Sequence, residues 1–289
     1  MILITGASGT AGGAVLQELA RMDAPIRAMY RSAKDTDKTP SGAESVIADF
    51  VDRASLERAL DGVDAVYVVC SPVRELVELE INMIEACRQA GVRQVVLNSA
   101  LGAADYPKSF PSWHRVVEDR LKASGLGYTI LRPNSFMQNL VTYNAAGIRS
   151  QGAFYASMGH ARCSLIDVRD VGVAAAKCLT SPEHAGKTYE LNGPEALTYG
   201  EVAEKISRAV GRPVRYVDIA SEQQRESMLS MGMPEWQVTA LLDLQAYYTG
   251  GQGGEVDDVL ARIIGRAPQT LDQYLAEFAS QFAPRATAP

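Results

Sequence analysis

The chain has 289 residues, 47% of them hydrophobic, which is enough for one large domain or for a large domain with a smaller second lobe. Its 34 acidic residues outnumber the 28 basic ones, and no basic block occurs. Direct binding of nucleic acid is therefore not expected. The four cysteines are scattered without metal-ligand spacing, so we expect buried thiols and no metal site.

The first residues, Met1–Thr5, run directly into a glycine-rich turn and are not expected to act as a signal sequence. No apolar run approaches the roughly 20 residues that cross a bilayer. We therefore expect a cytoplasmic protein without membrane contact.

Short apolar runs rich in β-branched residues alternate with longer helical patterns through the first half of the chain. Strands that are apolar throughout are buried on both faces, and alternation with helices makes them parallel. Right-handed crossovers then predict an α/β, doubly wound, Rossmann-type sheet. The expected strands are Ile2–Thr5, Ile26–Tyr30, Ser45–Ala48, Ala65–Cys70, Gln94–Ser99 and Tyr128–Leu131, and the expected helices are Ala11–Met22, Ser55–Leu60, Glu75–Ala90 and Ser112–Ala123.

The pattern becomes less regular after Pro133. We expect residues 1–133 to form the nucleotide-binding domain, with returning segments from about 164–192, and residues 134–289 to form mainly a small α/β C-terminal lobe that binds substrate. The tail Arg285–Pro289 is expected to be frayed. The later elements predicted are strands at Ser164–Ile166, Tyr189–Asn192 and Val214–Asp218, helices at Val168–Leu179 and Tyr199–Val210, and helical structure from Glu222 with a break at 250–254.

Three glycines with the spacing Gly6-x-x-Gly9-x-x-Gly12 follow the first strand and open the first helix. The first glycine permits a tight turn, the second lets a pyrophosphate approach the backbone, and the third lets the helix pack on the strand. The N-terminus of the helix offers free N–H groups to phosphates. The turn predicts a dinucleotide site whose contacts are Gly6, Ser8, Gly9, Thr10, Ala11 and Gly12.

The end of the second strand indicates which dinucleotide is bound. NAD-binding proteins place an Asp or Glu there to accept hydrogen bonds from the ribose 2′-hydroxyl. In this chain Arg31 follows the strand and Lys34 lies close behind, a pair that suits a 2′-phosphate. We expect NADP(H), with the alternative that Arg31 is a solvated strand end and Asp35 reaches the ribose.

Other cofactor contacts are expected at the carboxyl ends of the next strands. Asp49 and Phe50 close the third strand and are placed to contact the adenine, although Asp49 as a helix N-cap is the alternative. The loop after the fourth strand should cover the middle of the cofactor, and Ser99 should lie beside the nicotinamide. The loop residues are Cys70, Ser71 and Pro72.

Several stretches resemble the NmrA-like branch of the atypical short-chain dehydrogenases/reductases. The closest is Leu121–Pro133, within the longer stretch His114–Asn139, and the glycine turn, Arg31 and Asp49 also agree. The later segments Ile166–Val171 and Thr188–Ala196 fit as well, so the resemblance covers nearly the whole chain. It implies a Rossmann domain, a small substrate lobe and NADP(H) binding, as in NADPH-dependent quinone and triphenylmethane-dye reductases.

The catalytic Tyr-x-x-x-Lys pair of the wider superfamily is missing. Alignment on Glu118 puts His114 at the lysine position and Phe110 at the tyrosine position. Reduction of an ordinary ketone needs a proton donor, which Phe110 cannot be. His114 either holds the nicotinamide ribose or polarises the acceptor, or it forms an i,i+4 pair with Glu118 on the helix surface.

The substrate pocket is expected at the end of the sixth strand. Pro133 and Asn134 should contact the cofactor there, and Phe136 and Met137 suit a flat aromatic substrate. The other walls are assigned to Leu101 and to Trp236 with nearby methionines (Met228, Met231 and Met233), for which an ordinary lobe core is the alternative.

These features predict an NADPH-dependent reductase that transfers hydride to a small molecule, either quinone-like or another activated aromatic or imine acceptor. A non-catalytic NADP(H) redox sensor of the NmrA type is the alternative, because loss of the tyrosine fits both. The helices at 75–90 and 112–123 resemble dimer-forming helices, so a homodimer is also open.

Overall fold

Seven short strands pair into one parallel sheet with the order β3-β2-β1-β4-β5-β6-β8. The order reverses between β1 and β4, which is the arrangement of a doubly wound sheet. The predicted α/β fold class is confirmed. The strands are β1 (Ile2–Ile4), β2 (Ile26–Tyr30), β3 (Glu44–Ile47), β4 (Ala65–Val68), β5 (Gln94–Asn98), β6 (Gly127–Pro133) and β8 (Lys187–Leu191).

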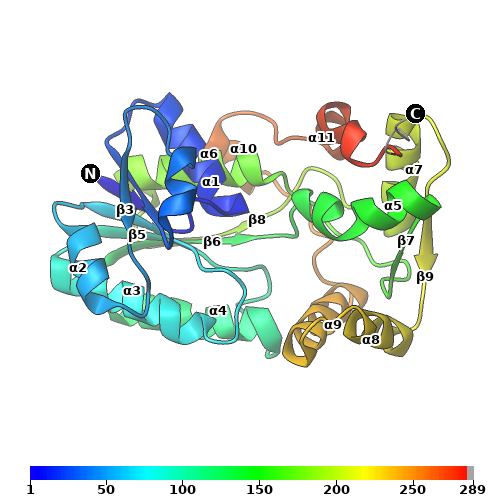
Figure 1. Cartoon of the computed structure of the whole chain (residues 1–289), viewed down its shortest axis with the longest axis horizontal. Coiled ribbons are helices and arrows are strands. Elements are labelled where there is room, and N and C mark those ends of the chain that lie inside the picture. Colours follow the sequence, from blue (N-terminus) through cyan, green and yellow to red (C-terminus); the bar gives the residue numbers. More distant parts are fainter. Residues whose placement is uncertain (285–289) are drawn as a thin grey trace. The chain divides into compact units, whose positions relative to one another are not determined.

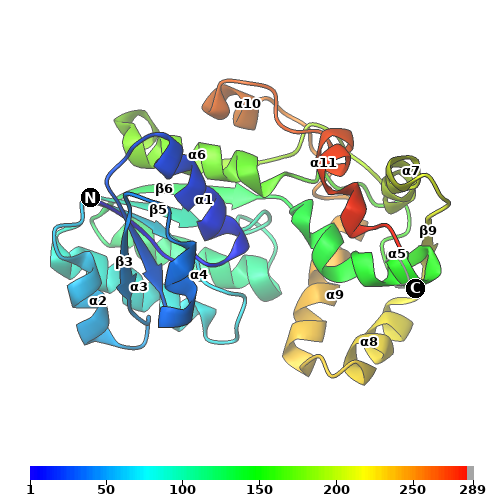
Figure 2. The same ribbon diagram turned by 45° about the horizontal axis from the view of Figure 1, so that its top comes forward.

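Helices cover both faces of this sheet. Helices α1 and α6 lie on one face, and α2, α3 and α4 lie on the other (Figure 1). The tilted view keeps the same two layers (Figure 2). Each helix connects two parallel strands, which requires a crossover. Their bounds are α1 (Thr10–Arg21), α2 (Arg53–Leu60), α3 (Leu76–Ala90), α4 (Ser109–Ala123) and α6 (Val168–Thr180), with 3₁₀ turns at Ala33–Lys38 and Pro182–His184.

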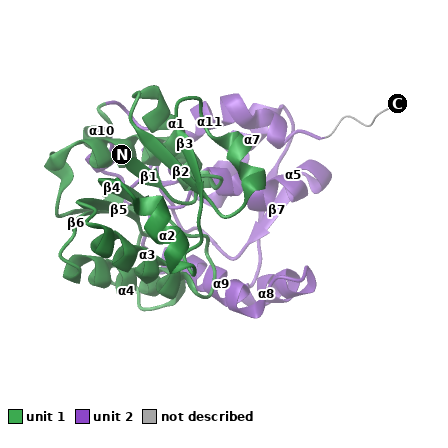
Figure 3. Ribbon diagram, turned by 60° about the vertical axis from the view of Figure 1, so that its left-hand side comes forward, with its two compact units in different colours: residues 1–133, 168–191, 262–265 green, residues 134–167, 192–261, 266–289 purple. Residues whose placement is uncertain are grey.

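The computed structural model describes residues 1–284, and these divide into two compact units (Figure 3). Unit 1 comprises residues 1–133, 168–191 and 262–265 and holds the sheet. Unit 2 comprises 134–167, 192–261 and, among the described residues, 266–284. The tail Arg285–Pro289, expected to be frayed, lies outside the described residues. No helix within residues 1–284 has the length and apolar character needed to span a bilayer.

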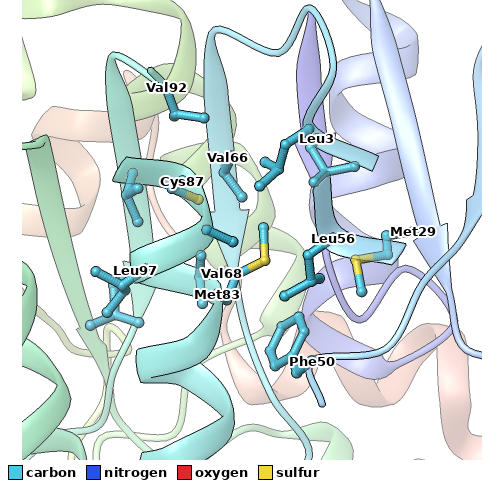
Figure 4. Close-up of a cluster of buried hydrophobic side chains, with 14 of the residues drawn as sticks. Leu3, Met29, Phe50, Leu56, Val66, Val68, Met83, Cys87, Val92 and Leu97 are labelled. Carbon is cyan, nitrogen blue, oxygen red and sulfur yellow. The ribbon is translucent and has the colours of Figure 1, made fainter. Parts of the chain in front are cut away.

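One core of unit 1 lies between the sheet and helices α2, α3 and α4 (Figure 4). Successive side chains of a strand point to opposite faces, so alternate residues enter this core. Leu3 from β1, Val66 and Val68 from β4, and Leu97 from β5 supply the sheet side, all 0% exposed. The helices supply Leu56, Leu60, Met83, Ile84, Cys87, Val117 and Leu121. Burial of these side chains fixes α3 and α4 against the sheet.

Unit 2 contains a two-stranded parallel sheet, β7 (Ala153–Ala156) with β9 (Arg215–Asp218), of which β7 was not predicted. Its helices α8 and α9 lie side by side (Figure 2) and enclose a small core of Met228, Val238 and Leu242. The helices that lie wholly in unit 2 are α5 (Ala145–Gln151), α7 (Tyr199–Val210), α8 (Ser221–Ser230), α9 (Glu235–Thr249) and α11 (Leu271–Phe278), with a π-helical turn at Leu140–Asn144 and a 3₁₀ turn at Ala279–Gln281. Helix α10 (Val259–Ile264) begins in unit 2, and its residues 262–264 belong to unit 1.

The strand predicted at Ser164–Ile166 is wrong. Two isolated bridges replace it, from Cys163 to Leu197 and from Ile166 to Phe136. Because the partners lie in different segments and run in opposite senses, no continuous ladder forms. The apolar character of this stretch reflects burial, since Ser164, Leu165 and Ile166 are at most 3% exposed.

Candidate functional site

The glycine turn after β1 folds tightly enough that side chains are excluded from it. Gly6 has a φ of +57°, in the left-handed region that favours glycine. A Cβ on Gly12 would lie 2.3 Å from the carbonyl oxygen of Gly6, well inside van der Waals contact. The N–H of Gly9 donates to that same carbonyl oxygen at 2.8 Å. The turn therefore has the backbone cradle that a dinucleotide pyrophosphate requires.

The N-terminus of α1 leaves backbone donors available to a ligand. Gly9 occupies the N-cap position and has no side chain to accept from the first turn. No acidic residue lies in that first turn. In most helices Ser, Thr, Asp or Asn would accept one of these N–H groups. An uncapped helix end next to a glycine cradle is suited to bind an anion.

A cavity of about 460 Å³ extends from this turn along the carboxyl ends of β2 and β4. It brings together residues from four loops of unit 1. Of the predicted cofactor contacts, those that line it are Gly6, Ser8, Gly9, Arg31, Lys34, Asp49, Phe50, Cys70 and Ser71. The remaining predicted contacts, Thr10, Ala11, Gly12, Pro72, Ser99, His114, Pro133 and Asn134, are not among its lining residues.

The cavity end beyond β2 carries positive charge. Arg31 and Lys34 are both exposed. No hydrogen bond or ion pair joins the Arg31 guanidinium to another residue within the described part of the chain. Asp35 also lines the cavity, but Lys38 binds its carboxylate at 2.8 Å and holds its pKa below the ordinary value. One oxygen of that carboxylate, Oδ1, is thus already used, and the competing ribose contact through Asp35 would fall to Oδ2.

Asp49 and Phe50 lie in the turn after β3 and not at its end, because the strand stops at Ile47. Asp49 Oδ1 accepts from the N–H of Val51 at 3.2 Å. The cap of α2 is Asp52, whose carboxylate accepts from the N–H of Ser55 at 3.2 Å, so the alternative of Asp49 as the helix N-cap is wrong. Phe50 is 9% exposed and joins the core with one edge on the cavity.

Ser99 belongs to a buried network around Glu118. Its hydroxyl donates to Glu118 Oε1 at 2.7 Å, and Arg132 binds both carboxylate oxygens at 2.8 and 2.7 Å. Burial raises the pKa of Glu118, but hydrogen bonds from Arg132 and Ser99 outweigh it and hold that pKa below its usual value. Glu118 is therefore an ionised, fully paired carboxylate that fixes the ends of β5 and β6 to α4.

His114 does not pair with Glu118 on the surface of α4, so that alternative is wrong. Its side chain is 12% exposed, and its Nδ1 lies 3.9 Å from Oε2 of Glu80 on α3. Glu80 is not among the site residues predicted from the sequence. A signal was present, since Glu80 falls on the buried stripe of α3 with Leu76, Met83 and Ile84, where a carboxylate is unexpected.

Phe110, which the sequence aligns with the superfamily tyrosine, makes an aromatic contact at the start of α4. Phe110 packs edge-on against Trp113, with ring centroids 5.1 Å apart and an interplanar angle of 81°. This geometry is a favourable one for aromatic pairs. Phe110 and Trp113 thus form a hydrophobic first turn of α4.

The predicted pocket residues differ in their accessibility. Leu101 and Met137 are only 5% and 1% exposed, and Phe136 and Trp236 are half-buried. Pro133 ends β6 and its carbonyl accepts from the N–H of Leu101 at 3.1 Å. In unit 2, Met228 belongs to the lobe core, as the alternative held, and Met231 is 72% exposed.

Asn134 is 2% exposed and its side-chain amide is fully used within unit 2. Nδ2 donates to Asn192 at 3.0 Å and to the carbonyl of Gly253 at 2.9 Å. Oδ1 accepts from the Tyr248 hydroxyl at 3.0 Å and from the Cys163 thiol at 3.3 Å. Because all its hydrogen-bonding groups have partners, Asn134 has a structural role and helps to hold the loop at 250–254 in place.

Comparisons with known proteins agree with this architecture. The model of the NmrA-like family matches residues 1–275. An NAD(P)H azoreductase of Xenophilus azovorans is 36% identical over 284 residues, covering 98% of this chain and 99% of that protein. A (4-alkanoyl-5-oxo-2,5-dihydrofuran-3-yl)methyl phosphate reductase of Streptomyces griseus is 34% identical over 286 residues, covering 98% of this chain and all of that one (100%).

Among solved structures, an NADPH-dependent quinone oxidoreductase of Escherichia coli, complexed with NADPH, superimposes with a TM-score of 0.89. It is 27% identical, and the alignment covers 96% of this chain and 99% of that one. The family match over nearly the full length, together with two relatives above 30% identity, shows that this chain belongs to the NmrA-like family.

Proposed function

We propose that this chain is an NADPH-dependent reductase of small aromatic acceptors, with azo compounds and quinones as the favoured classes. The observation that carries the proposal is the single cavity that joins the glycine cradle to the unpaired Arg31 guanidinium. A pyrophosphate and a 2′-phosphate are the two anionic parts of NADPH, and the cavity offers a cationic or N–H-rich end to each.

Different residues of unit 1 would bind different parts of NADPH. Gly6, Gly9 and the first N–H groups of α1 hold the pyrophosphate, and Gly12 keeps the helix close to it. Arg31 and Lys34 hold the 2′-phosphate, which a bidentate guanidinium recognises well. Asp49 and Phe50 contact the adenine with a carboxylate and an aromatic face.

Cys70 and Ser71, which line the cavity, would cover the middle of the cofactor. Outside that lining, we assign Pro72 to the same middle part, and Ser99 and Pro133 to the nicotinamide end. When bound, NADPH supplies a hydride. The contribution of the chain is to align the acceptor with that ring and to exclude water, which is sufficient for an acceptor that stabilises negative charge well.

The absence of the tyrosine favours such acceptors. A quinone becomes a stabilised hydroquinone anion, whereas an alkoxide from a ketone needs an acid that Phe110 cannot provide. Two of the similar proteins are named for acceptors of this type, one as an azoreductase and one as a quinone oxidoreductase. Half-buried Phe136 and Trp236 remain the candidate aromatic contacts for a flat acceptor.

Turnover tests the proposal directly. The purified chain is mixed anaerobically with NADPH and a panel of azo dyes, quinones and imines, and loss of the reduced nicotinamide is followed. We expect turnover with an azo dye or a quinone, and a slower rate with NADPH deuterated at C4. Tight NADPH binding without turnover of any acceptor contradicts the reductase and supports the redox-sensor alternative.

A further inference from the structure

The carboxyl group of Glu80 is buried away from solvent. Its side chain is 0% exposed on the inner face of α3. Oε1 accepts from the N–H of Cys70 at 3.1 Å, at the loop that lines the cofactor cavity. Oε2 is buried and has no hydrogen-bond partner among the described residues. A carboxyl oxygen left in this way costs free energy unless something uses it.

The atom that faces Oε2 is equally unsatisfied. His114 Nδ1, on α4, is buried, lacks a hydrogen-bond partner among the described residues, and lies 3.9 Å away. A shift of about 1 Å, within reach of a small side-chain rotation, would bring the two atoms to hydrogen-bond distance. Two unpartnered polar atoms on adjacent packed helices thus complement each other if one proton lies between them.

The surroundings favour the neutral forms of both groups. Burial raises the pKa of Glu80 to about 8, although the N–H of Cys70 lowers it. Burial lowers the pKa of His114 to about 4, although the charge of Glu118 raises it. At neutral pH the pair is a carboxylic acid beside a neutral imidazole, so the proton belongs to Glu80.

Among residues 1–284, the other titratable groups near the pair leave this assignment unchanged. On its own helix His114 has Glu118, which is already neutralised by Arg132 of β6. From the β4 side Glu80 has the Tyr67 hydroxyl and the Cys70 thiol, both with pKa values raised by burial, so both are neutral. The Tyr67 hydroxyl itself donates to Asn98 at 2.9 Å.

We propose that Glu80 is a positioning residue whose carboxyl group donates a hydrogen bond to His114 Nδ1, so that His114 keeps its proton on Nε2 for the role that the sequence predicts, polarising the hydride acceptor. This inference rests on the proposed reductase function. With Nδ1 accepting, the imidazole carries its single proton on Nε2. That N–H polarises the acceptor atom on which negative charge develops, and a solvent proton completes the reduction.

This hydrogen-bond arrangement predicts that activity falls at alkaline pH. Above the pKa of Glu80 the carboxylate accepts a hydrogen bond, and the imidazole moves its proton to Nδ1 to provide one. Nε2 then has only a lone pair and repels the developing charge. Activity should fall with the ionisation of Glu80, even though His114 itself stays neutral.

Glu80→Gln separates this role from simple packing. The amide oxygen can still accept from Cys70, and the amide NH₂ can donate to His114 Nδ1 at every pH, but it cannot ionise. We expect wild-type kcat/KM to fall about tenfold between pH 7 and about pH 10, with a midpoint near the pKa of Glu80. Glu80→Gln should reduce kcat/KM at pH 7 by only about threefold and remove the alkaline fall.

Two controls frame the result. Glu80→Leu removes the donor and should lower kcat/KM at pH 7 by about tenfold, which the conservative Gln rescues. Glu78→Gln makes the same chemical change on the exposed side of α3 and should leave the wild-type profile in place. An alkaline fall that persists unchanged in Glu80→Gln overturns the inference.

A second readout needs no turnover. The chain has three histidines, so ¹⁵N-imidazole NMR spectra are simple, and the His114 signals are those missing from His114→Gln. We expect the Nε2–H tautomer at pH 7, a change to Nδ1–H on ionisation of Glu80, and no change in Glu80→Gln. A charged or Nδ1–H imidazole at pH 7 overturns the inference even if the enzyme is active, whereas lack of turnover with the expected tautomer overturns only the proposed function.

Discussion

Arg132, near the end of β6, binds both carboxylate oxygens of Glu118 on α4, at 2.8 and 2.7 Å. The Arg132 side chain is 11% exposed and Glu118 is 0% exposed, so the pair is largely removed from water. Glu118 also accepts from Ser99 beyond β5. One buried carboxylate therefore ties together the ends of two strands and the helix that carries His114.

The first prediction concerns this pair. Arg132→Met leaves Glu118 buried without its main partner and should lower the free energy of unfolding by about 3 kcal/mol. Urea denaturation followed by circular dichroism measures it. The control is Arg21→Met, which breaks an exposed pair with Glu18 on α1 and should change stability by less than about 0.5 kcal/mol. Equal losses from the two variants would contradict a special role for the buried pair.

The second prediction concerns the glycine cradle. Gly12→Ala puts a Cβ 2.3 Å from the Gly6 carbonyl oxygen, so the turn must open. We expect NADPH affinity to fall by at least about tenfold, measured by fluorescence titration or calorimetry. Gly13→Ala is the matched control, because its Cβ would lie 3.4 Å from the nearest atom, and affinity should change less than about twofold. The prediction fails if both alanines have the same effect.

The third prediction concerns the choice of cofactor. Arg31→Ala should weaken NADPH binding by about tenfold or more and leave NADH binding nearly unchanged, since only NADPH has the 2′-phosphate. Affinities for both dinucleotides measured on one preparation give the ratio. Arg53→Ala removes an exposed arginine that pairs with Glu57 on α2 and should leave the ratio unaltered. An unchanged ratio in Arg31→Ala would assign the 2′-phosphate to another residue.

The fourth prediction is a pH dependence of stability. Burial raises the pKa of Glu80 from an ordinary 4.5 to about 8, so between these values the folded chain holds a proton that the unfolded chain has lost. Stability from this group is therefore complete below pH 4.5 and falls as pH rises toward 8. His114, with its pKa lowered to about 4 from 6.5, has the opposite effect, but only between those two values.

The window from pH 6.5 to 8 thus isolates Glu80 within the pair. The free energy of unfolding should fall there by about 2 kcal/mol relative to Glu80→Gln, from one proton over 1.5 pH units. Urea denaturation of both proteins at the two pH values gives the difference and cancels the other titrating groups. Parallel changes in the two proteins would show that Glu80 is already ionised at pH 6.5.

Much of unit 1 could be predicted because its signals are local. The strand Ile26–Tyr30 has the bounds expected, and α3 ends at Ala90 as expected, since apolar periodicity and helix-ending residues act over a few positions. The glycine turn is local for the same reason. The strand predicted at Ser164–Ile166 was wrong because a buried apolar run has the same sequence pattern as a strand. Ile166 and the neighbouring Cys163 pair with separate segments.

By itself, the amino-acid sequence determined the parallel sheet, the glycine cradle and the positions of Arg31 and His114, because each depends on residues close together in the chain. Only the tertiary structure decided which groups His114 and Ser99 face. Glu80 and His114 are 34 positions apart, and they meet because apolar side chains pack α3 and α4 on the same face of the sheet. That packing also removes water from both groups, which is the physical reason that their protonation could not be read from sequence spacing.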